Sequence, residues 1–147
     1  MSDSPVPVEL RQIERYRFET TFPGTTLGSF AVDEESPLGS GSGPNPGRLL
    51  AVAVGHCLGS TLFNCLERAH VVAAPIRTRV EVETGRNPQG RLRVRAISVT
   101  LATAPLNEAD RPRFDHCVEI FEQFCTVSGA VRDGIPIATQ VAVPPPV

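Results

Sequence analysis

The sequence predicts an α+β domain, because strand-like and helix-like segments follow one another in the order β-β-α-β-β-α-β. The prediction depends on two stretches. Residues 47–71 are apolar on nearly every helical face, as in a helix buried at the centre of a fold or an assembly. Residues 78–104 contain a strand, a turn and a longer strand, and charged side chains alternate with Val and Thr over residues 79–84. This order differs from the regular alternation of a doubly wound parallel sheet.

The N-terminal part is expected to contain an arm, a hairpin and a loop. Residues 1–13 carry two prolines and mixed polarity, which is typical of an arm. Residues 15–22 alternate large and polar side chains and end at a Pro-Gly turn signal, and residues 27–34 are expected to be the hairpin partner. Residues 36–47 are rich in glycine and proline and are expected to be a flexible connector.

The helices are predicted from their start signals and periodicity. Asn45-Pro46 is a helix start, because Asn can cap free amides and Pro fits the first helical position. A second helix is expected from about Asn107, with one amphipathic face formed by Phe114, Cys117, Val118, Phe121, Phe124 and Cys125.

The C-terminal part is expected to add a short turn, a strand and a tail. Residues 128–132 predict one short extra turn, closed by Asp-Gly, and residues 135–143 predict a final strand. Residues 144–147 form a Pro-rich tail. A single domain is therefore predicted over residues 14–143, between the arm and this tail.

The composition excludes several classes of function. Lys and Arg number 14 against 16 Asp and Glu, so the formal net charge is −2, and no basic cluster is present that would bind nucleic acid or an anionic membrane. The N-terminal segment lacks an apolar core of signal-peptide length, and polar residues interrupt the apolar stretch from Leu49, which is expected to fall short of a membrane span. A cytoplasmic location is therefore expected, where thiols are normally kept reduced.

The four cysteines fall in two segments of the same outline, H-C-x7-C, at residues 56–65 and 116–125. Structural zinc sites use closely spaced pairs such as C-x2-C or H-x3-H, whereas each outline separates its cysteines by eight residues. Adjacent His and Cys side chains also point about 100° apart on a helix, so they do not face one ion. Neither a metal nor another cofactor is predicted.

The same spacing limits the disulfides that can form. Two residues eight apart on a helix are separated by about 12 Å, whereas a disulfide needs Cα atoms within about 7 Å. Any bridge must therefore join the two helices or two chains. Antiparallel helices would set Cys57 opposite Cys125 and Cys65 opposite Cys117, and parallel helices would give the other match. The remaining alternative is that the thiols serve as small buried side chains.

Two further motifs do not indicate a site. The segment at residues 39–47 is glycine-rich and leads into a helix, but it lacks the G-K-[ST] ending of a phosphate-binding loop. No G-x-S-x-G of a serine hydrolase is present, and the spacing of His56 and Ser60 is a common coincidence. The sequence assigns no role to His56 or to His116.

Two cysteine-containing segments resemble the OsmC/Ohr family of small thiol-dependent proteins: Gly43–Leu62 (GPNPGRLLAVAVGHCLGSTL) and Phe114–Ile137 (FDHCVEIFEQFCTVSGAVRDGIPI). Cys57 falls on the first reactive cysteine of the family, after an N-P helix start. Cys125 falls on the second, in a C-x-V-[ST]-x-[AS]-[VL] stretch before a G-[IV]-P-[IV] strand. The resemblance implies an intertwined homodimer, in which antiparallel sheets wrap around two central helices.

The resemblance also implies a reaction, the reduction of organic hydroperoxides. Cys57 would attack the O–O bond and become a sulfenic acid, Cys125 would convert that acid to a disulfide, and a dithiol reductant would restore both thiols. Cys65 and Cys117 match no family motif and are expected to fill the core.

One position departs from the family pattern. The peroxidase members have a glutamate after the N-P pair, which holds an arginine against the reactive thiolate, whereas this chain has Gly47. Arg15, Arg17 and Arg48 are nearby in sequence, but none matches the position of the family arginine. Because burial without a cation disfavours the thiolate, the alternative function is a non-enzymatic dimeric module that binds a small apolar molecule.

Overall fold

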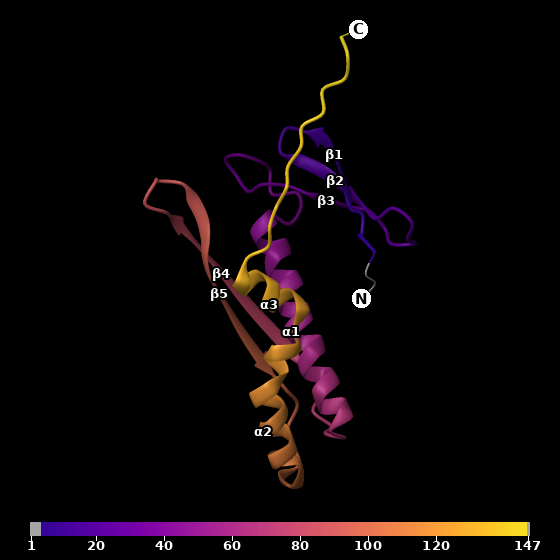
Figure 1. Ribbon diagram of the computed structural model, residues 1–147, viewed down its shortest axis with the longest axis vertical. Coiled ribbons are helices and arrows are strands. Elements are labelled where there is room, and N and C mark those ends of the chain that lie inside the picture. Colours follow the sequence, from indigo (N-terminus) through magenta and orange to yellow (C-terminus); the bar gives the residue numbers. More distant parts are fainter. Residues whose placement is uncertain (1–3, 147) are drawn as a thin grey trace. The chain divides into compact units, whose positions relative to one another are not determined.

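The structure, a computed structural model, describes residues 4–146. Three strands, a long helix, a pair of strands and two shorter helices follow one another along the chain, which is the predicted α+β composition (Figure 1). The chain forms two compact units. One contains the residues up to Gly55 and Arg79–Thr100, and the other contains His56–Thr78 and the residues from Leu101 onward. The predicted domain boundaries, with an arm, a single domain and a tail, stay a prediction.

The first unit contains a small antiparallel sheet. β1 (Glu9–Glu14), β2 (Arg17–Thr21) and β3 (Phe30–Val32) lie in the order β1-β2-β3, and Phe18 pairs with Val32 across the last two strands (Figure 1). The predicted hairpin is therefore present, with a shorter second strand. β1 begins within the segment expected to be an arm, residues 1–13, and ends one residue beyond it, because its backbone finds hydrogen-bond partners along β2 while its side chains stay exposed.

The glycine-rich loop after β3 is held by the buried carboxylate of Asp33. The backbone N–H and hydroxyl groups of Ser40 and Ser42 donate four hydrogen bonds of 2.8–3.1 Å to Asp33 Oδ2. Gly39 is required because a Cβ atom there would lie 2.1 Å from the Glu34 carbonyl oxygen. The expectation of a flexible connector is therefore wrong, because the N–H and hydroxyl groups of the loop donate hydrogen bonds to the Asp33 carboxylate of the same chain.

Asp33 should make the stability of the protein depend on acid. Hydrogen bonds from the Ser40 hydroxyl and from Ser42 hold the pKa of Asp33 well below its ordinary value near 3.8, against the effect of burial. Because the folded-state pKa is lowered, this stabilisation is fully present above the unfolded pKa and is lost as the pH falls toward the folded pKa. We expect Asp33→Asn to reduce the free energy of unfolding at neutral pH and to weaken its decline below about pH 4.

Chemical denaturation of the wild type and of Asp33→Asn over a series of pH values measures this effect. Asp133→Asn, which changes an exposed carboxylate, is the matched control and should retain the acid dependence of the wild type. An identical acid dependence for the wild type and Asp33→Asn would contradict the assignment.

α1 (Pro46–Arg68) begins where the sequence predicts it. The Asn45 side chain accepts a hydrogen bond from the Arg48 N–H at 2.9 Å, and the Asn45 carbonyl accepts one from the Leu49 N–H at 3.1 Å. Pro46 occupies the first helical position, where an N–H would have no partner within the helix.

By length and composition alone, α1 could cross a membrane. Its 23 residues include an 18-residue window with a mean hydropathy of 1.7. The expectation that this stretch falls short of a membrane span is therefore wrong, since its polar interruptions do not lower the mean enough. The core helix of a soluble protein has the same signature, so the composition alone does not indicate a membrane protein.

β4 (Arg77–Arg86) and β5 (Leu92–Ala102) form a two-stranded sheet, drawn as a long ribbon in Figure 1. In the turn between them, Asn87 Oδ1 accepts hydrogen bonds from the N–H groups of Gln89 and Arg91 at 3.1 and 2.9 Å. The predicted strand, turn and longer strand are thus confirmed. Most of their side chains are exposed in the single chain.

The predicted second helix is divided into pieces. A 3-10 turn (Glu108–Asp110) leads into α2 (Arg111–Ile120), and a second one (Phe121–Phe124) leads toward α3 (Thr126–Asp133). Cys125 lies between the last two with extended backbone angles, φ −79° and ψ 108°. One continuous amphipathic face therefore does not form. The short extra turn predicted near residue 130 belongs to α3.

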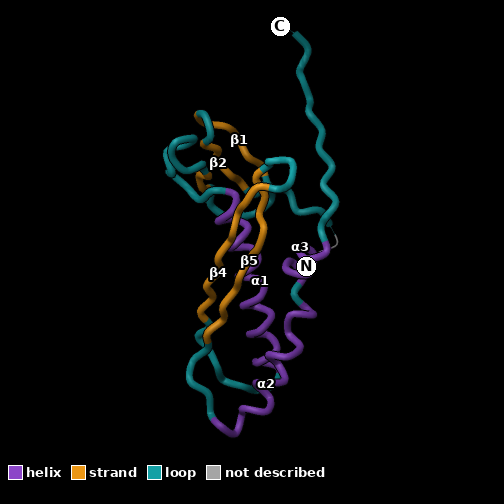
Figure 2. The backbone as a smooth tube through the Cα atoms, turned by 90° about the vertical axis from the view of Figure 1, so that its left-hand side faces the viewer, coloured by secondary structure: helices purple, strands orange, loops and turns teal. Residues whose placement is uncertain are grey.

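The core of the second unit lies between the second half of α1 and the segment from α2 to α3. These helices run side by side in both views (Figures 1 and 2), and the sequence colours of Figure 1 show that α1 and α2 run in opposite directions. The buried apolar side chains of this unit are Leu58, Leu62, Leu66, Val71, Ala73, Cys117, Phe121 and Cys125. Val118 and Phe124 were predicted on the same face but are exposed, Val118 within α2 and Phe124 at the end of the second 3-10 turn.

The predicted final strand at residues 135–143 is wrong for the described chain, in which this segment has no regular structure (Figure 2). α3 ends at Gly134, whose φ of 81° is a conformation that glycine adopts without strain. A strand needs a neighbour for its backbone hydrogen bonds, and neither sheet of the described residues includes this segment. Ile137 and Val141 are consequently 88% and 84% exposed.

Candidate functional site

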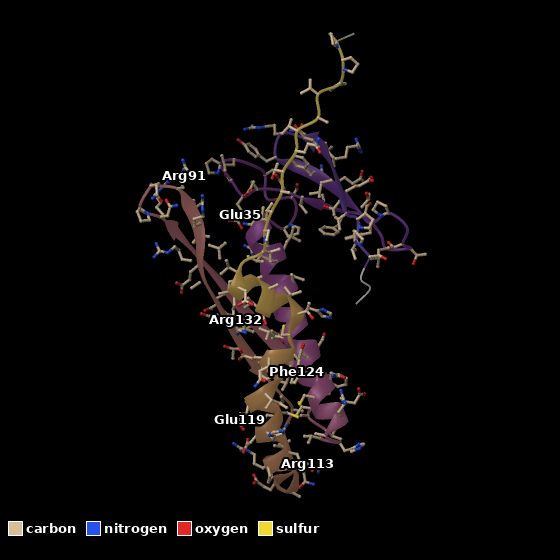
Figure 3. The ribbon with its side chains drawn as sticks, viewed as in Figure 1. Glu35, Arg91, Arg113, Glu119, Phe124 and Arg132 are labelled. Carbon is tan, nitrogen blue, oxygen red and sulfur yellow. The ribbon has the colours of Figure 1, made fainter. Side chains whose placement is uncertain are left out.

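The antiparallel packing of the second unit brings the four cysteines together in two pairs. Cys57 lies close enough to Cys125 to lower its pKa, and Cys65 lies close enough to Cys117 to raise its pKa. This is the match predicted for antiparallel helices, and it excludes the parallel alternative. All four cysteines are free thiols. Figure 3 shows sulfur atoms between α1 and the segment from α2 to α3.

Cys57 and Cys125 reach each other from different elements. Cys57 is half-buried on α1, where the Thr61 hydroxyl donates a hydrogen bond of 2.7 Å to its carbonyl oxygen. Cys125 is 3% exposed and lies directly before α3, where its carbonyl accepts the first helical hydrogen bond, from the Gly129 N–H at 3.0 Å. The half-buried thiol of Cys57 therefore lies against the buried thiol of Cys125.

The beginning of α3 supplies donors to both sulfurs. The Val127 N–H donates a hydrogen bond to Cys57 Sγ at 3.5 Å. Burial raises the pKa of the Cys125 thiol, but hydrogen bonds from the Ser128 hydroxyl, the Cys57 thiol and the Ser128 N–H outweigh it, so this pKa lies below its ordinary value. The Ser128 hydroxyl is buried beside this sulfur, and it has no hydrogen-bond partner of ordinary geometry among the described residues.

The second pair has the opposite electrostatic environment. Cys117 is 1% exposed, and burial together with its contact with Cys65 raises its pKa to about 11. Cys117 is therefore a protonated thiol at neutral pH, whereas the surroundings of Cys125 favour the thiolate. Thiolate is the form that reacts with peroxides and disulfides.

The two histidines next to the cysteines in sequence make no hydrogen bond with them among the described residues. His56 Nε2 lies 3.3 Å from Ser60 Oγ, and both side chains are exposed. His116 is exposed as well. Within residues 4–146, neither histidine makes a hydrogen bond with a thiol. This region of the structure therefore supports no serine hydrolase site.

Gly47 lies in the first turn of α1, where the sequence of the family leads one to expect a glutamate. The next residue, Arg48, pairs instead with Glu35, through Nε and Nη2 at 3.3 and 2.9 Å from Oε1. Among the described residues, no arginine side chain makes a hydrogen bond with Cys57. The hydrogen-bond donors to the sulfurs of Cys57 and Cys125 are thus backbone N–H and hydroxyl groups.

Two contributors to this site were not predicted. Ser128 could have been recognised from the C-x-V-[ST] spacing, which places a hydroxyl residue three positions after the cysteine. Val127 contributes its backbone N–H, for which no side-chain signal exists in the sequence. The described residues include no group of three or more His, Cys, Asp or Glu that could hold a metal ion. Two thiols in contact can, however, lose two electrons and form a disulfide.

Comparison with known proteins assigns the chain to a family. Residues 39–140, which make up more than half of the chain, match the model of the family described as OsmC-like protein. The chain therefore belongs to the OsmC-like protein family. The sequence has no significant match among curated proteins.

Solved structures share the fold. An OsmC-like protein of unknown function from Vibrio cholerae is 9% identical, with a TM-score of 0.71 over 86% of this chain and 93% of that one. An organic hydroperoxide resistance protein OsmC from Legionella pneumophila is 16% identical, with a TM-score of 0.67 over 90% and 92%. The organic hydroperoxide resistance protein OhrB of Bacillus subtilis is 21% identical, with a TM-score of 0.62 over 89% and 93%. The predicted α+β OsmC-like fold is therefore confirmed.

Replacing Ser128 tests the electrostatics of the site. We expect Ser128→Ala to raise the pKa of Cys125, because the hydroxyl that stabilises the thiolate is removed while the burial remains. Ultraviolet absorbance of the thiolates during a pH titration measures the change. Thr126→Ala removes a neighbouring exposed hydroxyl and should leave the titration unchanged. Identical titrations for the wild type and Ser128→Ala would contradict the assignment.

Proposed function

We propose that this protein reduces organic hydroperoxides through Cys57 and Cys125. The observation that carries the proposal is the contact between these thiols at the beginning of α3, where hydrogen-bond donors reach both sulfurs. Membership of the OsmC-like family supports a redox role. The names of two structural relatives, both organic hydroperoxide resistance proteins, support the substrate class.

In the first step, the Cys57 thiolate attacks an oxygen of the O–O bond. The S–O bond forms as the O–O bond breaks, the alcohol leaves with a proton, and Cys57 becomes a sulfenic acid. Cys57 is assigned this step because it is half-buried, whereas Cys125 is 3% exposed. The Val127 N–H can stabilise charge on the attacking sulfur, in the role for which the family motif provides an arginine.

In the second step, Cys125 attacks the sulfenic sulfur of Cys57. The S–S bond forms, the S–O bond breaks, and the oxygen leaves as water after it takes up a proton. The surroundings of Cys125 favour its thiolate, which is the form that attacks in this step. This matters because a sulfenic acid that is not trapped can be oxidised further.

In the third step, a dithiol reductant restores the pair. Its thiolate attacks the half-buried Cys57 sulfur, Cys125 leaves as the stabilised thiolate, and a mixed disulfide joins Cys57 to the reductant. The second thiol of the reductant then attacks the reductant's own sulfur in that bond, so the reductant becomes a disulfide and Cys57 is released as a thiol. A thiol with a low pKa is the better leaving group in thiol–disulfide exchange. A reducing compartment such as the cytoplasm supplies this kind of reductant.

The decisive experiment adds one equivalent of tert-butyl hydroperoxide to the reduced protein. We expect the loss of two thiols per chain, release of tert-butanol, and a Cys57–Cys125 linked peptide in a non-reducing digest. Cys125→Ser should still consume one equivalent and leave a sulfenic acid at Cys57 that dimedone traps. Cys57→Ser should reduce peroxide consumption by at least ~100-fold, as expected when a nucleophile is removed.

The absence of both peroxide consumption and the linked peptide in the wild type would overturn the proposal. That result would favour the second candidate function, a binding module for a small apolar molecule. A cavity of about 370 Å³ between the end of α1 and the following loop, lined by Phe63, Leu66 and Val71–Ala74 among others, supports this candidate. Unchanged ligand binding in Cys57→Ser, together with no peroxide turnover in the wild type, would establish it.

We further propose that the protein is a homodimer. Only 28% of the apolar window of α1 is buried within one chain, and Val52 and Phe63 on this helix are 65% and 44% exposed. A second copy would cover these side chains and could offer strands to the unpaired segment at residues 135–143.

Multi-angle light scattering should give a mass of twice the single chain, and Val52→Lys should shift it toward the monomer because a charge at an apolar interface is costly. Arg79→Lys, on the exposed side of β4, is the matched control. A monomeric wild type at every concentration would contradict the proposal.

A further inference from the structure

The second cysteine pair lies outside the proposed reaction and has no counterpart in the family motifs. Cys65 is half-buried on α1, and Cys117 on α2 is, with Leu66, one of the two largest fully buried side chains of the described residues. The antiparallel helices (Figure 1) set Cys65 beside Cys117, close enough for Cys65 to raise the pKa of the Cys117 thiol. A purely space-filling role requires neither the matched position of the two sulfurs nor the partial exposure of one of them.

We propose that Cys65 and Cys117 are a second redox couple, which closes a disulfide between α1 and α2 when the protein meets excess organic hydroperoxide. This inference does not rest on the proposed function of Cys57 and Cys125. We call this couple a latch, because its disulfide would join α1 to α2 within one core and stabilise the fold. It would not be oxidised and reduced in each catalytic cycle.

The two couples are separate because of helix geometry. Cys57 and Cys65 are eight residues apart on α1, or about 12 Å, which exceeds the Cα separation of about 7 Å that a disulfide allows. The Cys65 thiol therefore cannot reach the Cys57 sulfur along the helix to exchange with a Cys57–Cys125 disulfide. The second couple needs its own encounter with an oxidant.

The reaction begins at Cys65, since Cys117 is 1% exposed. The Cys65 sulfur attacks the O–O bond, which breaks as an S–O bond forms and the alcohol leaves with a proton. The Cys117 sulfur then attacks the sulfenic sulfur, the S–S bond forms, and the oxygen leaves as water with the Cys117 proton. The second step is slow because the pKa of Cys117 is raised to about 11, so little thiolate is present.

The same environment makes the closed disulfide persistent. Reduction releases the Cys117 sulfur into a buried site that disfavours its thiolate, and a thiol with a high pKa is a poor leaving group. The Cys125 site, in contrast, stabilises its thiolate. The latch should therefore close later than the first couple and reopen later.

The test uses the double variant Cys57→Ser/Cys125→Ser, which retains only the second couple, with excess tert-butyl hydroperoxide. We expect both remaining thiols to be lost, a Cys65–Cys117 linked peptide in a non-reducing digest, and a higher Tm than for the reduced variant. Adding Cys65→Ser is the matched control, in which Cys117 should stay a thiol. Persistence of both thiols, or oxidation of Cys65 alone, would overturn the inference.

Wild-type protein provides a second measurement that does not depend on the folding of a variant. Stepwise oxidation should remove two thiols first and the other two later, and a limiting dithiol should reopen the Cys57–Cys125 bridge first. A wild type that never forms the Cys65–Cys117 bridge would also overturn the inference. A Cys65–Cys117 bridge without peroxide consumption by Cys57 would leave this inference standing and reject the proposed function.

Discussion

The site of this protein depends on the antiparallel packing of the second half of α1 against α2 and the beginning of α3. Cys57 and Cys65 are eight residues apart on one helix, and Cys117 and Cys125 have the same spacing along the other segment. Opposite chain directions therefore set each cysteine of α1 beside one of the other segment. Leu58, Leu62 and Leu66 fill the core around them, so the burial that stabilises this unit also fixes the sulfur contacts.

The difference between the two pairs follows from local backbone structure. Cys125 lies where a 3-10 turn ends and α3 begins, so N–H groups without helical partners and the Ser128 hydroxyl are available to a thiolate. Cys117 lies within α2, where the helix uses its own N–H groups, and both burial and the neighbouring Cys65 raise its pKa. Two thiols on the same side of one core are thereby given opposite pKa shifts.

Several parts of the fold could be predicted from local patterns. The start of α1 at Asn45, the strand–turn–strand segment and the order of elements follow from capping residues, turn residues and side-chain alternation, which act over a few neighbours. The break at Phe121–Cys125 could not be predicted, because the apolar spacing continues through it. The loop at residues 36–47 was misjudged because its order comes from Asp33, which lies outside the loop.

By itself, the sequence determined the α+β class, the two cysteine segments, and the fact that neither helix could close its own cysteine pair. Those conclusions need only periodicity and the rise of a helix. The tertiary structure decided that the helices are antiparallel, and hence which thiols meet. It also decided that Ser128 and the Val127 N–H serve the sulfurs, because the direction of packing and the partners of a backbone group depend on contacts between distant segments.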